Sequence, residues 1–364
     1  MDHPRRLQRD SAHHHRRTRP RPAERTEHAV TATDFAELHD DLRAVAADVL
    51  ARGRVVDWST MVDAGWVGLE IPDGFGGAGA TFAETAVICQ QLGRAAAATH
   101  YLGGAVLTVG LLNSLQHSEV RDALLADVAA GRTRVAAVIG GSFALDGERR
   151  LTGRADFVPD AHGADRLLVV ATDASGADVV ATVEGLTVTG QPVLDETRHV
   201  ATVTADGVEV AEPLPLAGSA QSVLNRAAVA VACDSLGLAE AMLDATVSYA
   251  RTRQQFGRPI GSFQAVKHAC ADMLVKISVA RSLVREAVDA LVANETHESD
   301  VAVAMAKSYT CAAAVDVVGK ALQLHGGIGY TWESGIHVYL KRATFNRSLF
   351  GSPAAHRRRL AQRY

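Results

Sequence analysis

The sequence predicts an α+β protein with an N-terminal helical domain, a middle antiparallel β-sheet or barrel domain, and a C-terminal four-helix bundle. Three observations predict this fold class. Apolar residues recur at helical spacing over residues 33–131. Short β-branched runs separated by Gly, Asp and Pro follow over 135–210. Long alanine- and valine-rich helical repeats then begin near residue 220, so we place the domains at 31–133, 134–215 and 216–364.

The N-terminal domain opens with an amphipathic helix whose apolar residues recur at steps of three and four. These residues are Phe35, Leu38, Leu42, Val45 and Val49. A loop follows, because Pro72 and the four glycines of 74–79 impose a turn that a helix cannot continue through. Helices are then predicted at 82–92, 101–115 and 120–128, and the middle one is almost wholly apolar and therefore central.

The middle domain is predicted from short runs of β-branched residues. The runs lie at 135–139, 166–171, 179–183 and 200–204. No helix of crossover length lies between them, so we predict antiparallel pairing. The bundle helices that follow are predicted at 220–253, 261–294, 300–324 and 336–346. Helices of this length and composition are typical of a bundle.

Charge and composition exclude several classes of partner. Lys and Arg number 37 against 41 Asp and Glu, and the basic residues are scattered through the body of the chain, which argues against nucleic acid. Residues 1–30 form the exception, because arginines surround three histidines there, and we expect a disordered basic tail. The sequence has no unbroken window of about 20 apolar residues, so we predict no membrane span.

The cysteine and histidine spacings predict neither disulfides nor a metal site. The four cysteines lie far apart, which fits buried thiols in a reducing compartment, and we expect a cytoplasmic protein. The histidines at 268, 325, 337 and 356 have no second ligand at recognisable spacing.

The first of two distinctive motifs is the run YARTRQQFGRPI at 249–260, followed by Phe263 and Gln264. Arg253 offers a planar, permanently charged fork for a pyrophosphate. Phe256 offers an apolar face, and the Gln264 amide can both donate and accept hydrogen bonds. Taken alone, Arg253 could equally form a surface ion pair.

The second motif is QLHGGIGY at 323–330. Gly326 and Gly327 lack side chains, so backbone N–H groups can approach a phosphate closely. A glycine pair alone also suits the end of a helix. The prediction of a dinucleotide site therefore depends on the two motifs occurring together.

These motifs, together with Gly65–Gly79 and Gln90–Arg94, resemble the acyl-CoA dehydrogenase family over nearly the entire chain from about Thr33. The resemblance implies FAD as cofactor, an acyl-CoA as substrate and an electron-transferring flavoprotein as acceptor. In that family, the two C-terminal motifs contact the adenosine and pyrophosphate half of an FAD whose ring lies mainly in the neighbouring subunit, which implies an oligomer, expected to be a tetramer. The cofactor-binding residues implied here are Arg253, Gln255, Phe256, Gln264, Gln323, Gly326 and Gly327.

Two departures from the family pattern concern the reaction itself. Most members carry a catalytic Glu just before a Gly, where this chain has Phe350 and Gly351. The isovaleryl and long-chain branches place the Glu on an earlier helix. The corresponding position here is near Arg226-Ala227, where no acidic residue is in reach. The family's flavin-facing segments are replaced by 138–144 and 155–158. Both usual positions of the base are empty, so the catalytic residue stays unassigned.

Three functions are compatible with this pattern. The chain is a partner subunit of a heteromeric dehydrogenase, similar to paired actinobacterial enzymes acting on sterol side-chain thioesters, or it is self-sufficient with a displaced base such as Glu333 or Glu240. We expect instead that Glu333 caps the helix from Ile336 and that Glu240 lies on the bundle surface. The third function is a scaffold that has lost the flavin. A doubly wound oxidoreductase is disfavoured, because no strand leads into Gly-x-Gly-x-x-Gly.

Overall fold

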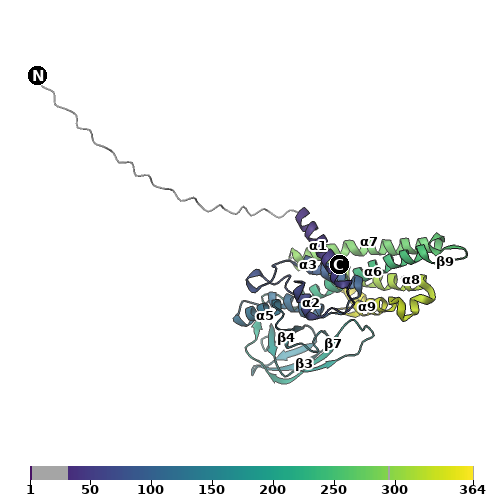
Figure 1. Ribbon diagram of the computed structural model, residues 1–364. Helices are drawn as coiled ribbons and strands as arrows, with labels where there is room; N and C mark the ends of the chain where they lie inside the picture. Colours follow the sequence, from purple (N-terminus) through teal and green to yellow (C-terminus); the bar gives the residue numbers. More distant parts are fainter. Residues whose placement is uncertain (2–31, 294–295, 364) are drawn as a thin grey trace. The chain divides into compact units, whose positions relative to one another are not determined.

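The computed structural model describes Met1, residues 32–293 and residues 296–363. The chain divides into two units, Met1–Leu38 and His39–Tyr364, and everything that positions the candidate site belongs to the second (Figure 1). Apart from Met1, the predicted basic tail of residues 1–30 lies outside the described residues.

The first part of the chain is helical, as predicted. Its helices are α1 (Ala32–Leu50), α2 (Trp58–Asp63), α3 (Phe82–Ala95), α4 (Thr108–Asn113) and α5 (Glu119–Ala129). Thr81 begins α3 with a capping box, in which its hydroxyl accepts from Ala83 N while Glu84 accepts from Thr81 N. The apolar helix predicted over 101–115 is buried, but it consists of a π-helical turn, Leu102–Leu107, that leads into α4.

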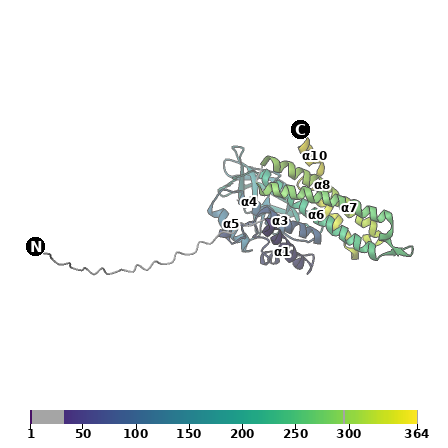
Figure 2. The same cartoon turned by 90° about the horizontal axis from the view of Figure 1, so that it is seen from above.

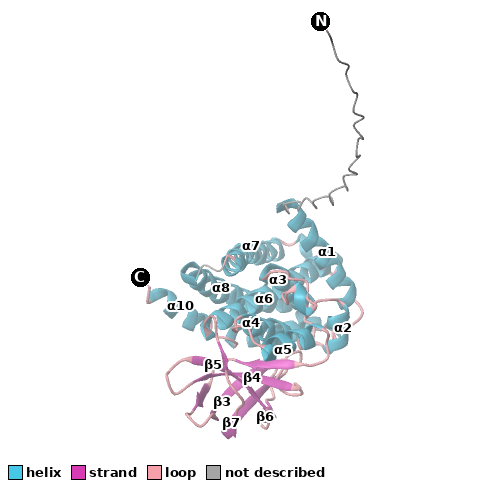
Figure 3. Cartoon of the chain, turned by 90° about the vertical axis from the view of Figure 1, so that its left-hand side faces the viewer, coloured by secondary structure: helices cyan, strands magenta, loops and turns pink. Residues whose placement is uncertain are grey.

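The strands that come between the two helical regions in the sequence form one sheet, which lies below the helices in Figure 3. They are β1 (Val135–Val138), β2 (Ser142–Leu145), β3 (Arg150–Pro159), β4 (Arg166–Thr172), β5 (Asp178–Val183), β6 (Thr187–Gly190), β7 (Val200–Glu209) and β8 (Leu214–Pro215). The order is β6-β7-β3-β2-β4-β5-β8, with β1 also paired to β4.

The prediction that all strands pair antiparallel was wrong, because the sheet is mixed. Both β1 and β2 run parallel to β4, with Val135 opposite Arg166 and Ala144 opposite Thr172. The strand β3 carries the chain back on the other side of β2, so β4 enters parallel to β1 and β2 without a crossover helix. The prediction had assumed that only a helix could make that return.

The C-terminal part is a helical bundle. Its helices are α6 (Ala220–Thr252), α7 (Gln264–Val292), α8 (Thr296–His325), α9 (Ile336–Ser348) and α10 (Pro353–Ala361). The helices α6, α7 and α8 pack along one another (Figure 2). The four predicted bundle helices are present. The helix α10 was not predicted, because it lacks apolar periodicity and is identified mainly by its Ser352 cap and Pro353.

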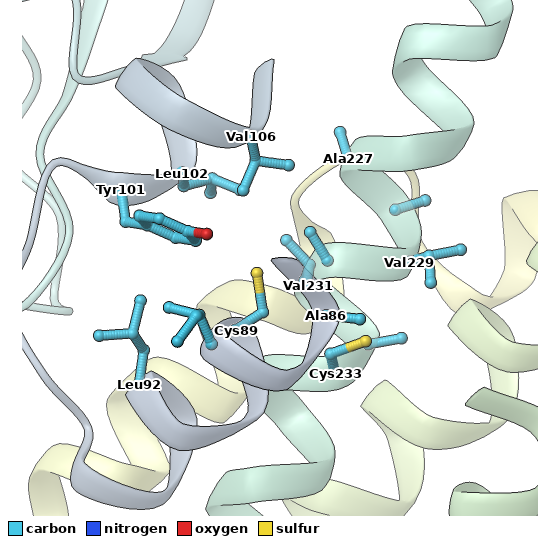
Figure 4. Close-up of a cluster of buried hydrophobic side chains, with 14 of the residues drawn as sticks. Ala86, Cys89, Leu92, Tyr101, Leu102, Val106, Ala227, Val229, Val231 and Cys233 are labelled. Carbon is cyan, nitrogen blue, oxygen red and sulfur yellow. The ribbon is translucent and has the colours of Figure 1, made fainter. Parts of the chain in front are cut away.

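Two glycines let α3 and α6 cross closely. A methyl group on Gly93 would lie 2.0 Å from the Asp234 carbonyl oxygen, and one on Gly237 would lie 2.0 Å from the Gln90 carbonyl oxygen. The apolar cluster beside this crossing includes Cys89 and Leu92 of α3 and Cys233 of α6 (Figure 4). Burial and the nearby Asp234 raise the pKa of Cys89 to about 12, which makes it an inert thiol.

The helix α8 is long and apolar enough to cross a membrane when judged by length and composition alone. Most of its apolar stretch is buried, and it packs against α6, α7 and α10. We therefore interpret α8 as the core helix of the bundle.

Candidate functional site

An apolar cavity of about 690 Å³ lies where the sheet meets α9. The sheet contributes the end of β1, the last residues of β3 and the segment before β7, while the bundle contributes α9 and the turn after it. The lining residues are Leu107, Ala137, Ile139, Asp156, Phe157, Val158, Pro159, Val193, Leu194, Asp195, Leu340, Lys341, Thr344, Phe345, Ser348, Leu349 and Phe350.

Phe350 occupies the turn between α9 and α10 and lines this cavity. Its φ is 55°, a left-handed conformation that is uncommon for a bulky residue. The position that the sequence singled out as the usual place of a base therefore does adjoin the cavity, and its side chain has no proton acceptor.

Two carboxylates line the cavity among the described residues, and neither suits proton abstraction. Asp156 accepts hydrogen bonds from Arg154 at 2.8 Å and from Thr202 Oγ1 at 2.7 Å, and these bonds lower its pKa. Asp195 is 1% exposed, and its Oδ1 accepts from both the backbone N–H and the hydroxyl of Thr197. Its Oδ2 has no partner among the described residues but is enclosed by protein, so neither oxygen is open to a substrate. A general base works best with a pKa near the operating pH, which Asp156 lacks.

Glu240 does not lie on the bundle surface, and that prediction was wrong. It is 8% exposed and accepts from Gln90 Nε2 at 2.8 Å and from Arg281 Nη2 at 2.7 Å. Arg94 also pairs with it. The carboxylate therefore joins α3, α6 and α7, does not line the cavity, and is a structural ion-pair centre rather than a displaced base.

Glu333 is exposed, and the prediction that it caps α9 was also wrong. The backbone N–H of Ile336 donates to Ser334 Oγ at 3.4 Å instead. Hydrogen bonds from its own backbone and from Thr331 lower the pKa of Glu333. Because Glu333 does not line the cavity, the structure supports neither alternative base proposed from sequence.

The structure gathers several predicted cofactor-binding residues at a second cavity of about 480 Å³, at the end of α6 and α7 that lies far from the sheet (Figure 1). Gln255, Phe256 and Gln323 line it. Phe256 and Gly257 form the two-residue turn of the β9–β10 hairpin (Gln254–Gln255 and Arg258–Pro259), both with positive φ, as a type I′ turn requires. This turn leaves the Phe256 side chain 90% exposed.

The other predicted residues surround this end of the bundle without lining the cavity. Arg253 ends α6 and Gln264 begins α7, and both are exposed. Gly326 and Gly327 follow α8, and nothing in the described chain lies within 4 Å of a methyl group placed on either. In a single chain these residues therefore face outward, where a molecule bound at this end of the bundle could contact them.

Lys320 is a lining residue of the second cavity that the sequence analysis missed. Its ammonium donates to Gln323 Oε1 at 2.7 Å, a neutral partner that leaves the charge available to an anion. The sequence could have indicated Lys320, because it lies one helical turn before Gln323 and therefore on the same side of the helix.

A buried ionic network, also missed from sequence, fixes two walls of the first cavity. Asp234 of α6 pairs with Arg342 of α9 and with Arg198 in the segment before β7. Burial by itself would raise the pKa of Asp234, but the two arginines outweigh it and hold the pKa below its usual value. Arg342 also donates to Ala97 O at 2.6 Å and to Thr197 Oγ1 at 2.9 Å. The network thus joins the helical regions to the sheet.

Comparisons with known proteins agree with this architecture. Residues 23–132 match the family model "Acyl-CoA dehydrogenase, N-terminal domain", and residues 217–364 match "Acyl-CoA dehydrogenase, C-terminal domain". Acyl-CoA dehydrogenase IpdE2 of Mycobacterium tuberculosis is 33% identical over 349 residues, which cover 93% of this chain and 96% of that protein. The chain belongs to the acyl-CoA dehydrogenase family. Membership confirms the predicted family and fold class, and FAD is the cofactor of this family, as the resemblance implied.

Two solved structures of acyl-CoA dehydrogenases show the same fold. The ChsE4-ChsE5 complex from Mycobacterium tuberculosis superposes with a TM-score of 0.81 at 25% identity, covering 92% of this chain and 98% of that one. A variant of the Tcur3481-Tcur3483 steroid ACAD superposes with a TM-score of 0.80 at 27% identity, covering 90% and 98%. Each of these structures pairs two differently named proteins.

Proposed function

We propose that this chain is the partner subunit of a heteromeric, FAD-dependent acyl-CoA dehydrogenase. In this assembly its C-terminal turns complete the FAD site of a different subunit, which supplies the catalytic base. The observation that carries the proposal is an asymmetry between the two cavities. The cavity beside Phe350 has no available base, whereas the cofactor-binding end of the bundle keeps its aromatic, amide and cationic groups.

The residues at that end suit the adenosine diphosphate half of FAD. Phe256 presents an exposed ring, and Gln255 and Gln323 present amides that can donate and accept. Arg253 and Lys320 supply positive charge for a pyrophosphate. When bound, FAD accepts the hydride in the α,β-dehydrogenation of an acyl-CoA thioester, and a carboxylate is needed to remove the α-proton.

The outer face of α7 supports assembly with another subunit. Val275 and Val279 lie one turn apart on the same face of the helix and are 63% and 41% exposed, and the adjacent Leu274 is 51% exposed. An exposed apolar stripe of this kind is typical of a surface that another chain covers. Both similar solved structures named above pair two different proteins, which favours a second, distinct subunit over a second copy.

The test is the flavin content of the purified protein. We would express the chain alone and together with a second acyl-CoA dehydrogenase chain that carries the catalytic Glu, and measure flavin absorbance and FAD per subunit. The proposal predicts FAD only in the co-purified assembly, at about one FAD for two subunits. Full occupancy in the chain alone would refute it and establish a self-sufficient flavoprotein, and a colourless assembly with every partner would favour the scaffold.

A matched pair of substitutions locates the contribution of this chain. Arg253→Ala removes the cation assigned to the pyrophosphate, so we expect the FAD affinity of the assembly to fall by one to two orders of magnitude, as for loss of a hydrogen bond to a charged group. Arg251→Ala removes a neighbouring exposed arginine of α6 and is the control. Equal FAD affinity in both variants would exclude Arg253 from the cofactor site.

A further inference from the structure

We infer that Lys320 is a positioning residue that fixes the amide orientation of Gln323, so that this end of the bundle presents a hydrogen-bond donor to the cofactor. Both residues belong to α8 and line the second cavity. The inference rests on the proposed function, because it takes this cavity as the place of the adenosine diphosphate half of a partner subunit's FAD. It adds which end of the Gln323 amide faces that cofactor and what holds it there.

The orientation follows from the chemistry of the two side chains. Lys320 Nζ lies 2.7 Å from Gln323 Oε1. An ammonium can only donate hydrogen bonds, whereas an amide has an oxygen that accepts and a nitrogen that donates. The near atom must therefore be the oxygen, because the reverse orientation would place two donors against each other. The Nε2 group of Gln323 has no partner among the described residues and is the end of the amide left for a ligand.

Lys320 bonds to an amide because the acidic residue one turn away is already paired. Asp316 precedes Lys320 by four residues on α8, the spacing at which an acidic and a basic side chain normally pair. Asp316 Oδ2 accepts instead from Lys276 Nζ of α7 at 2.6 Å. Lys320 is thus left with a neutral partner, and its other N–H groups remain available to an anion.

The walls of the second cavity give the fixed amide its consequence. Apolar side chains such as Ile260 and Val266 form much of the lining, the polar side chains are Gln255, Lys320 and Gln323, and no carboxylate lines it in the described part of the chain. Lys320 and Gln323 are exposed in a single chain, where a hydrogen bond between side chains contributes little. Once a partner covers them the local dielectric falls, so the bond strengthens and a donor without an acceptor becomes costly. The assembled site therefore selects a cofactor group that accepts a hydrogen bond.

The experiment measures the FAD affinity of the co-purified assembly, by titrating the flavin-depleted protein with FAD and following flavin fluorescence. Gln323→Glu keeps the shape of the side chain and can pair with Lys320, but it replaces the donor by an acceptor. Gln323→Met removes the donor without adding a charge. We expect the Kd for FAD to rise on the order of tenfold in both variants.

The two Gln323 variants distinguish the possible roles of the amide. If the oxygen faced the cofactor, Gln323→Glu would retain FAD while Gln323→Met lost it. If added charge alone mattered, only Gln323→Glu would lose FAD. Either result would overturn the inference, and so would unchanged affinity in both variants.

A double-mutant cycle tests the positioning role of Lys320. Lys320→Met should raise the Kd on the order of tenfold in the wild-type background but by less in Gln323→Met, because the lysine acts partly through the amide. Lys320→Arg keeps a donor and should stay within about threefold of the wild type. Lys267→Met removes an exposed lysine of α7 that does not line the cavity and is the control. Equal effects of Lys320→Met in both backgrounds would contradict the positioning role.

Arg253→Ala separates this inference from the proposed function. If Arg253→Ala weakens FAD binding while both Gln323 variants keep it, the cofactor lies at this end of the bundle and only the amide orientation is refuted. If no substitution of Arg253, Lys320 or Gln323 changes the affinity, the cofactor lies elsewhere, and the proposed function fails together with the inference.

Discussion

Asp234 is a buried carboxylate whose two arginine partners come from different parts of the chain. It is 3% exposed, and Arg342 beside it is 0% exposed. A charge in such a place is tolerated only while it is paired, because removing one member leaves the other buried and uncompensated.

Asp234→Asn is therefore expected to lower the free energy of unfolding by about 3–5 kcal/mol. Asp244→Asn is the control, because that carboxylate is 66% exposed in its pair with Arg94 and should contribute less than about 1 kcal/mol. Urea denaturation at pH 7 measures both. Because the folded pKa of Asp234 lies below 3.8, its contribution is present above pH 3.8 and is lost as the pH falls through the folded value. Equal losses in the two variants would contradict the network's role.

Lys307 of α8 is buried, and its ammonium donates to the carbonyl oxygens of Asn346 and Gly351. It gives a pH dependence of stability in the alkaline range. Burial lowers its pKa below 10.5, so between the folded value and 10.5 the unfolded chain binds more protons and stability rises with pH. Lys307→Met should abolish that rise, and it should also cost about 1–3 kcal/mol at pH 7, because the carbonyls that Lys307 satisfies lose their donor. Thermal unfolding between pH 7 and 10.5 is the measurement, and an unchanged slope in the variant would show that another group titrates.

At the scale of elements, the crossing of α3 and α6 depends on glycine. Gly237→Ala would place a methyl group 2.0 Å from the Gln90 carbonyl, which is backbone and cannot swing aside. We expect the two helices to be forced apart, which should lower the free energy of unfolding by about 1–3 kcal/mol or more.

Gly319→Ala on α8 is the control for the Gly237 substitution, because nothing in the described chain lies within 4 Å of its new methyl group. The better helix propensity of alanine should stabilise that variant by up to about 1 kcal/mol. Opposite shifts in the denaturation midpoint would support the crossing geometry. A tolerated Gly237→Ala would mean that α3 and α6 approach less closely than described.

At the scale of the whole molecule, the exposed apolar stripe of α7 is expected to be an interface with the partner subunit. Val275→Asp puts a charge on the apolar stripe of α7 and should prevent association with the partner subunit, while changing the stability of the chain by no more than about 0.5 kcal/mol, as is usual for exposed positions. Val120→Asp on α5 is the matched control. Sedimentation or size-exclusion analysis of the mixed subunits would show loss of the assembly in the first variant only, and an intact assembly would exclude this face of α7 from the interface.

The sequence by itself determined the order of helical, strand and helical regions, the family, and the absence of a base at position 350. These properties are local, because periodicity and motifs depend on residues close together in the chain. It missed strands such as β2 and β6, which have only four residues each. It also missed α10, whose polar residues show no periodic pattern.

Only the tertiary structure decided how distant residues meet. The parallel pairing of β1 with β4, the burial of Glu240 between Arg94 and Arg281, and the pairing of Asp234 with Arg342 all join segments far apart in sequence. No local pattern encodes which partner a buried charge finds, because its pairing and desolvation depend on the packing of the whole chain. For the same reason, Phe350 could be recognised from sequence as lacking a proton acceptor, but its place on a cavity wall could not. Nor could the hydrogen bonds that Lys307 and His356 make to the turn that carries it.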